Sequence, residues 1–149
     1  MNNNSFFITT PIYYVNDSPH IGHAYTSIAC DVIARFNRLN NKTTMFLTGT
    51  DEHGLKIEQA AKKNKMDTKK FVDQMNVSFK ELTKTLNLSN DFFVRTTEAY
   101  HKKASQHIWD ILKKNNQIYL DKYKGWYSVS DEAYFNEDEI LVKVKERND

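Results

Sequence analysis

The sequence predicts an α/β fold with a parallel sheet, and two observations lead to this prediction. Segments typical of strands alternate with longer segments of helical periodicity over residues 1–117. Such alternation favours parallel strands joined by right-handed helical crossovers. The chain has 149 residues, of which 40% are hydrophobic, so it can bury a packed core. The pattern is that of the first half of a Rossmann-like fold.

The first strand and the first helix are expected to be joined by a polar loop. Phe6–Thr10 is predicted to be a strand that ends at Pro11, and 13–19 a loop, because it is rich in turn-forming residues. A helix that faces the core is expected from about Ile21 to Leu39. Its apolar residues recur at helical spacing, and they are Ile21, Ala24, Ile28, Val32, Phe36 and Leu39.

The following segments continue the alternation. A second strand is predicted over Thr43–Thr48, with a tight turn at Gly49. Two helices should follow, one over 56–65 and one that begins after Asp67, a favourable N-cap residue. A third strand over 92–96 includes Arg95, which is a candidate for an ion pair. The last helix of this part is expected over 100–115, with Trp109 in the core.

From residue 118 onward the pattern changes to short strand-like segments separated by turns. Residues 118–124, 125–129 and 134–135 are predicted to be strands, and the polar segment 141–149 has no closing signal. We therefore expect two parts: residues 1–117, the first half of the parallel-sheet domain, and residues 118–149, the start of a small β-rich inserted domain.

The composition limits the classes of function. A formal net charge of +2 argues against a protein that wraps DNA. Cys30 is the only cysteine, so neither an intrachain disulfide nor a multi-cysteine metal site can form. No apolar run approaches the length of a membrane helix, and the first residues do not resemble a signal peptide. These features predict a cytoplasmic protein without a membrane partner.

The segment from Pro11 to His23 is the first candidate site. It follows the first strand and opens the first helix, where ligands bind in open α/β sheets and where free backbone N–H groups attract anions. His20 and His23 lie on either side of Gly22. Their imidazoles can donate hydrogen bonds to phosphate oxygens, and a glycine lets a nucleotide approach the backbone closely.

The segment from Phe46 to Gly54 is the second candidate. It ends the second strand with Asp51, Glu52 and His53, at the same edge of the sheet as His20. Such a cluster can bind an ammonium group, a ribose or a metal. A purely structural interpretation is also available, since acidic residues favour the first turn of a helix.

The motif His20-Ile21-Gly22-His23 resembles the HIGH signature of class I aminoacyl-tRNA synthetases. The block Gly49-Thr50-Asp51-Glu52-His53-Gly54, together with 13–16, 91–98 and 125–127, is similar to the methionyl branch of that class. The likeness runs from about Phe6 to Glu139. The resemblance implies a HUP-type catalytic domain.

The resemblance also implies roles for individual residues. Ile12 and Tyr14 would line a methionine pocket, and Asp51 would hold the substrate ammonium group. His20 and His23 would stabilise the ATP phosphates, with Mg²⁺ bound to them, and Gly22 would lie under the adenine. The motif-flanking residues are Pro11, Asn16, Pro19, Ile21, His53 and Gly54. The implied reaction activates methionine with ATP and transfers it to tRNA(Met).

The sequence departs from the family pattern in two ways. Ser128 and Asp131 stand where many members have zinc-binding cysteines, so this chain resembles the zinc-free subgroup and no structural zinc is predicted. The family's KMSKS loop, the second half of its sheet and its anticodon-binding domain have no counterpart here. The resemblance therefore implies an incomplete, N-terminal portion that is inactive alone.

Two other functions fit the same residues. One is a small nucleotidyltransferase of the same fold, since such proteins are complete near this length. The other is a non-catalytic half-synthetase that binds a ligand without turnover. The block from Gly49 to Gly54 and the β-rich start after Gly125 argue against the first alternative. The second predicts binding of ATP or methionine without turnover.

Overall fold

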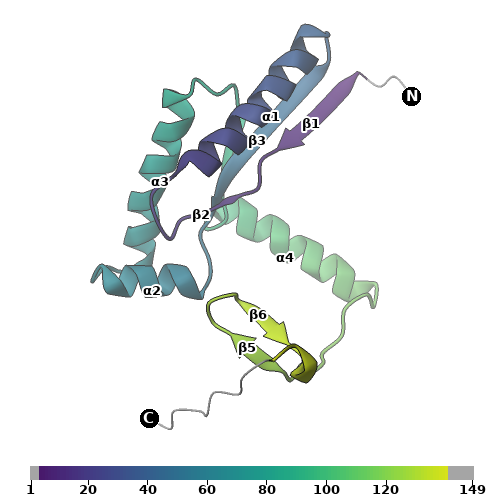
Figure 1. The fold of residues 1–149 in the computed structure, drawn as a ribbon. Coiled ribbons are helices and arrows are strands. Elements are labelled where there is room, and N and C mark those ends of the chain that lie inside the picture. Colours follow the sequence, from purple (N-terminus) through teal and green to yellow (C-terminus); the bar gives the residue numbers. More distant parts are fainter. Residues whose placement is uncertain (1–3, 141–149) are drawn as a thin grey trace. The chain divides into compact units, whose positions relative to one another are not determined.

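The computed structural model describes residues 4–140 (Figure 1). It contains one four-stranded sheet in which all pairings are parallel, formed by β1 (Ser5–Thr9), β2 (Tyr13–Tyr14), β3 (Thr43–Asp51) and β4 (Phe92–Arg95). β1 and β2 pair one after the other with β3, and β4 pairs with the other edge of β3. The predicted parallel α/β arrangement is confirmed.

Four helices connect or follow these strands: α1 (Ile21–Leu39), α2 (Leu55–Lys63), α3 (Thr68–Thr85) and α4 (Ala99–Lys114). α1 lies along β1 and β3 (Figure 1). α3 begins at the predicted N-cap, because the Asp67 carboxylate accepts a hydrogen bond from the Lys70 amide. These bounds lie within two residues of the predicted ones.

The chain divides into two compact units, one up to Trp109 and one from Asp110 onward. The second unit contains the antiparallel pair β5 (Trp126–Ser128) and β6 (Ala133–Phe135), followed by a short 3-10 helix, Glu137–Glu139. The predicted strand over 118–124 is wrong, since this segment has no regular secondary structure. The predicted polar tail, 141–149, lies outside the described residues.

The core of the first unit forms between β2, α2 and α3. It comprises buried aromatic and aliphatic side chains, which are Tyr13, Val15, Ile57, Ala61, Phe71, Val72 and Phe79. The 3.6-residue period of α2 and α3 explains this core, because the apolar residues of each helix fall on one face.

The prediction that the apolar stripe of α1 faces the core is wrong for most of its members. Ala24 is buried, but Ile21 is 84% exposed and Val32, Phe36 and Leu39 are also exposed. The buried face instead carries small or polar residues, namely Ala24, Ser27, Asp31, Ala34 and Asn37. Small side chains allow the helix to lie close to the sheet, and the polar ones form hydrogen bonds. Trp109 on α4, expected in the core, is also exposed.

Candidate active site at the carboxyl ends of the strands

The first turn of α1 is capped by its own two histidines. His20 has an extended backbone at the N-cap, and its Nδ1 accepts a hydrogen bond from the Gly22 amide at 3.1 Å. The Nδ1 of His23 accepts one from the His20 amide at 3.0 Å. Because each Nδ1 is an acceptor, the proton of either neutral ring must be on Nε2, at the far side of the ring. Both rings can therefore present an N–H donor to an anion.

The His23 ring is fixed by aromatic neighbours from two other elements. Its centroid lies 4.8 Å from that of Tyr13 on β2 and 5.2 Å from that of Phe79 on α3, both edge-on. The His20 ring lies 3.9 Å away. Burial, followed by the electrostatic interaction with His20, lowers the pKa of His23. His23 is thus favoured as a neutral donor near neutral pH.

Gly22 has a packing role that the sequence reasoning did not anticipate. A Cβ atom at this position would lie 2.9 Å from Cε1 and 3.1 Å from Nδ1 of His20. The imidazole that caps the helix therefore folds over the glycine. A side chain at position 22 would displace the ring of His20.

The short strand β2 joins the two candidate segments. The residues 13–19 were predicted to be a loop, but Tyr13 and Tyr14 pair in parallel with Thr50 and Asp51. Tyr13 faces inward, where its hydroxyl lies 2.8 Å from Oγ of Ser27. Sequence reasoning missed this strand, although an aromatic and β-branched run, Tyr-Tyr-Val, is typical of one.

Tyr14 lies over the turn that follows β3. Gly54 has φ 122° and precedes α2, and a Cβ atom there would lie 2.0 Å from the Tyr14 hydroxyl oxygen. Tyr14 and Asp51 are register partners. The structure therefore places the Tyr14 side chain against Gly54 and the Tyr14 backbone beside that of Asp51.

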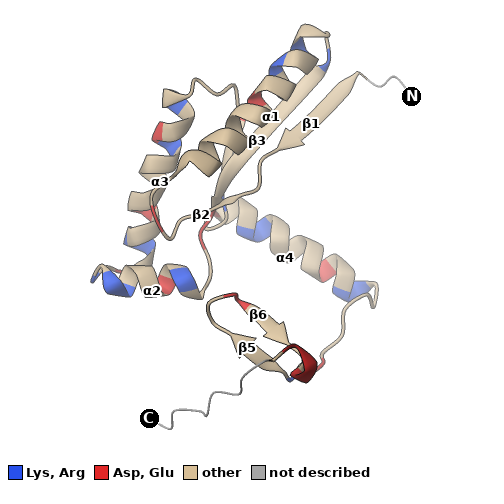
Figure 2. Ribbon diagram, in the orientation of Figure 1, with Lys and Arg blue, Asp and Glu red and all other residues tan. Residues whose placement is uncertain are grey.

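Figure 2 shows acidic residues in red at the end of β3, and the two that lie there, Asp51 and Glu52, differ in burial. Asp51 is half-buried, and its carboxylate lies 3.5 Å from the Thr96 hydroxyl. Glu52 is buried and pairs with Arg95, with Nε to Oε1 at 2.6 Å and Nη2 to Oε2 at 2.9 Å. The prediction of an Arg95 ion pair is confirmed. Because Glu52 is buried and already paired, its carboxylate cannot contact a ligand, whereas that of the half-buried Asp51 can.

Burial by itself would raise the pKa of the Glu52 carboxyl. The hydrogen bonds from Arg95, Thr97 and Thr50 outweigh this effect and hold the pKa below its ordinary value. Glu52 is therefore a carboxylate at neutral pH, in spite of its burial.

The remaining predicted residues lie around this centre. His53 is exposed, and its Nε2 lies 3.3 Å from the Thr96 carbonyl oxygen. It lines a cavity of about 270 Å³ with Thr96 and four residues of α4, which are His101, Lys102, Ser105 and Gln106. Among the motif-flanking residues Pro19 is half-buried, and Pro11, Asn16, Ile21 and Gly54 are exposed. Ile12, which the resemblance assigns to the methionine pocket, is also exposed.

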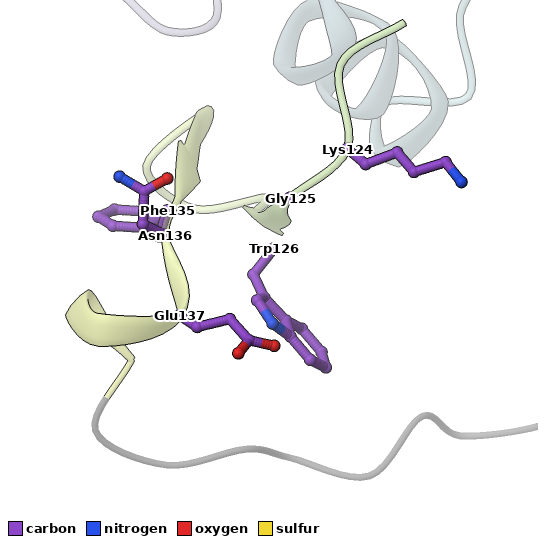
Figure 3. A pocket seen from close by; sticks show the side chains of 6 residues that line it. All are labelled: Lys124, Gly125, Trp126, Phe135, Asn136 and Glu137. Carbon is purple, nitrogen blue, oxygen red and sulfur yellow. The ribbon is translucent and has the colours of Figure 1, made fainter.

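The second unit has a separate cavity of about 470 Å³ on the β5–β6 pair (Figure 3). Trp126 and Glu137 line it, and their side chains lie side by side. None of the predicted site residues lines this cavity.

Residues 4–140 contain no cluster of three or more His, Cys, Asp or Glu side chains that could hold a metal ion. Among the same residues, no helix is long and apolar enough to cross a membrane.

Comparisons with known proteins identify the family. A protein-family model described as "tRNA synthetases class I (M)" matches residues 6–146. A methionine–tRNA ligase of Rickettsia bellii is 57% identical over 140 residues, which are 94% of this chain and 28% of that protein. The enzyme of Thermotoga maritima is 49% identical over 142 residues, 95% of this chain and 23% of that protein.

Solved structures give the same result. The Mycobacterium tuberculosis methionyl-tRNA synthetase in complex with methionyl-adenylate matches with a TM-score of 0.87 and 47% identity, over 93% of this chain and 28% of that chain. A leucyl enzyme, from an Agrobacterium radiobacter complex with tRNA, has a TM-score of 0.76 at 22% identity, which indicates a shared fold only. The chain spans about a quarter of the length of these curated relatives. It belongs to the methionyl-type family of class I tRNA synthetases.

Proposed function

We propose that this chain forms the part of a methionine–tRNA ligase that binds methionine and the phosphates of ATP. The observation that carries the proposal is the cluster around β2. There His23 packs against Tyr13 of β2 with the His20 ring beside it, and Tyr14 of the same strand is the register partner of Asp51 at the carboxyl end of β3. A related protein of known structure binds methionyl-adenylate, which contains both an aminoacyl and an adenylate group.

Each group in the cluster suits one part of the reaction. The Asp51 carboxylate would bind the methionine ammonium group, while Ile12 and Tyr14 would line the side-chain pocket. The Nε2–H groups of His20 and His23 would donate to phosphate oxygens, and Gly22 would lie under the adenine. The methionine carboxylate attacks the α-phosphate of ATP and pyrophosphate leaves, and the methionyl group then passes to tRNA(Met). Mg²⁺ would accompany the ATP, and the site of action is the cytoplasm, where these substrates occur.

The domain organisation belongs to the same proposal. Residues 1–117 would be the first half of the catalytic domain, and 118–149 the beginning of the inserted domain. The change from parallel β4 to the antiparallel pair β5–β6 supports this division.

Methionine binding by the 149-residue chain is the direct test. We expect calorimetry to show binding of L-methionine that the Asp51→Asn variant loses, because the amide no longer carries the charge that pairs with the ammonium group. ATP–pyrophosphate exchange should be absent, since the family's lysine loop has no counterpart in this sequence. The proposal is wrong if the chain does not bind methionine at millimolar concentrations. Pyrophosphate exchange that depends on methionine and on no other amino acid would refute only the expectation that the chain is inactive.

Two substitutions at His20 separate helix capping from ligand binding. His20→Ala should lower the stability by about 1 kcal/mol, whereas His20→Asn should preserve it, because asparagine is a favourable N-cap residue. Neither variant has the Nε2–H donor, so both should bind ATP more weakly. Thermal unfolding and ATP titration provide the measurements. Wild-type ATP affinity in His20→Asn would contradict the assigned role.

We further propose that the chain holds no structural zinc. The turn after β5 is closed by its own side chains, since the Ser128 hydroxyl donates to the Asp131 carboxylate at 2.6 Å and accepts from the Asp131 amide at 3.3 Å. Serine is a poor zinc ligand. We expect elemental analysis to find no stoichiometric zinc and a chelator to leave the melting temperature unchanged. One zinc per chain would disprove this.

A further inference from the structure

We propose that the buried ion pair between Glu52 and Arg95 is a positioning device that aims Asp51 at the ammonium group of the substrate. This inference rests on the proposed function for the identity of the ligand. The geometric part of it, the orientation of Asp51, does not.

The Glu52 carboxylate is surrounded by donors from three elements. Its side chain has 0% exposure. It accepts hydrogen bonds from Arg95 on β4 at 2.6 and 2.9 Å, from Thr50 on β3 at 2.8 Å and from Asn76 on α3 at 3.3 Å, and from the Thr97 hydroxyl. A buried carboxylate is costly unless it is paired and hydrogen-bonded in this way. These hydrogen bonds hold the Glu52 carboxylate in one orientation.

Arg95 is itself held from two sides. Its planar guanidinium contacts both oxygens of Glu52, and Nη2 also lies 2.5 Å from Oδ1 of Asp73 on α3. A bidentate pair fixes direction as well as distance, which a lysine ammonium cannot reproduce. The arginine therefore ties the ends of β3 and β4 to α3.

The neighbours of Glu52 are fixed by the residues that follow Arg95. The Glu52 amide donates to the Thr96 hydroxyl at 2.8 Å, and that hydroxyl lies 3.5 Å from the Asp51 carboxylate. The Thr96 carbonyl oxygen is 3.3 Å from the His53 ring. Successive side chains of an extended segment point to opposite sides. With Glu52 held inward directly after the last residue of β3, Asp51 is expected to point to the opposite side.

Buried ion pairs seldom add stability beyond that of apolar residues of the same volume. A pair that is buried beside a proposed ligand group, with every oxygen occupied, is better explained by orientation than by stability. Neither Glu52 nor Arg95 needs to touch the substrate. Their effect reaches it through Asp51.

The test compares L-methionine with its analogue that lacks the amino group, on the whole 149-residue chain. Only methionine has the ammonium group, so the ratio of the two dissociation constants measures the contribution of Asp51. In Arg95→Lys, which keeps the charge but loses the bidentate contact, we expect methionine affinity to fall by roughly ten-fold and that of the analogue to change by less than about two-fold. Equal losses for both ligands, or none, would overturn the inference.

Two controls keep the test decisive. Asp73→Asn weakens the outer contact of Arg95 and the exposed ion pair with Lys69, and it leaves the contacts between Arg95 and Glu52 in place. It should shift the ratio in the same direction by less, and it serves as the test if Arg95→Lys does not fold. Glu58→Gln neutralises an exposed glutamate that pairs with Lys62 and should leave the ratio unchanged.

The scalar couplings of the Asp51 side chain, measured by NMR without a ligand, test the positioning role separately from the proposed methionine binding. We expect one χ1 rotamer in the wild type and averaging in Arg95→Lys. If the wild type binds neither ligand, the proposed function fails. Couplings of Asp51 that are identical in both proteins would overturn the positioning role, whatever the binding result.

Discussion

Replacing Arg95 with methionine should lower the free energy of unfolding by about 3–5 kcal/mol, the cost of leaving a buried charge without its partner. Glu52 would keep its other hydrogen bonds but lose both contacts to the guanidinium. Methionine retains much of the apolar volume of the arginine stem, so packing is disturbed little. Urea unfolding at neutral pH measures the difference.

The matched control is Lys62→Met. Lys62 and Glu58 also form an ion pair, at 2.7 Å, but their side chains are 74% and 49% exposed. An exposed pair of this kind contributes at most about 1 kcal/mol. Similar losses in the two variants would show that the burial of Glu52 does not determine the cost.

The decrease in the free energy of unfolding caused by Arg95→Met should also depend on pH. In the wild type the pKa of Glu52 is held below its ordinary value, so its contribution to stability is present above the ordinary pKa and is lost as the pH falls through the lowered one. Without Arg95, burial raises the pKa, and protonation of Glu52 then favours the folded state. The difference in unfolding free energy between variant and wild type should therefore become smaller as the pH falls from 7 to about 4. A constant difference would contradict this explanation.

Gly54→Ala should be the second strongly disruptive change. At φ 122° and ψ 162° the backbone is in a region that is essentially restricted to glycine, which costs about 1–3 kcal/mol for other residues. The added Cβ would also lie 2.0 Å from the Tyr14 hydroxyl oxygen and would push this side chain away from Asp51. We expect a loss of stability together with a loss of methionine binding.

The double variant Gly54→Ala with Tyr14→Phe separates the two causes. Removing the hydroxyl relieves the steric conflict but not the backbone strain, so part of the stability should return. Gly125→Ala is the control, because a Cβ atom there would have its nearest neighbours at 3.5 Å. Thermal unfolding should show little change for this control, and a large loss in it would argue against the explanation.

Local patterns identified most elements of the fold. α1 begins and ends where predicted, because its start is marked by a capping residue and its length by regular apolar spacing. The same pattern did not tell which face of α1 is buried. Periodicity identifies a helix, but the face that meets the sheet is chosen by close packing, and here Ser27 and Ala34 fit where larger side chains do not.

The candidate site also depends partly on local sequence patterns and partly on tertiary contacts. The sequence alone singled out His20, His23 and Asp51 as candidates, since these residues carry the motifs and follow strands whose carboxyl ends lie at one edge of the sheet. Only the tertiary structure decided that β2 pairs with β3, because a two-residue strand depends on its partner and not on its own composition. It also decided that Glu52 turns inward to Arg95, a residue 43 positions away. Contacts between distant residues are set by packing of the whole fold, which no local pattern specifies.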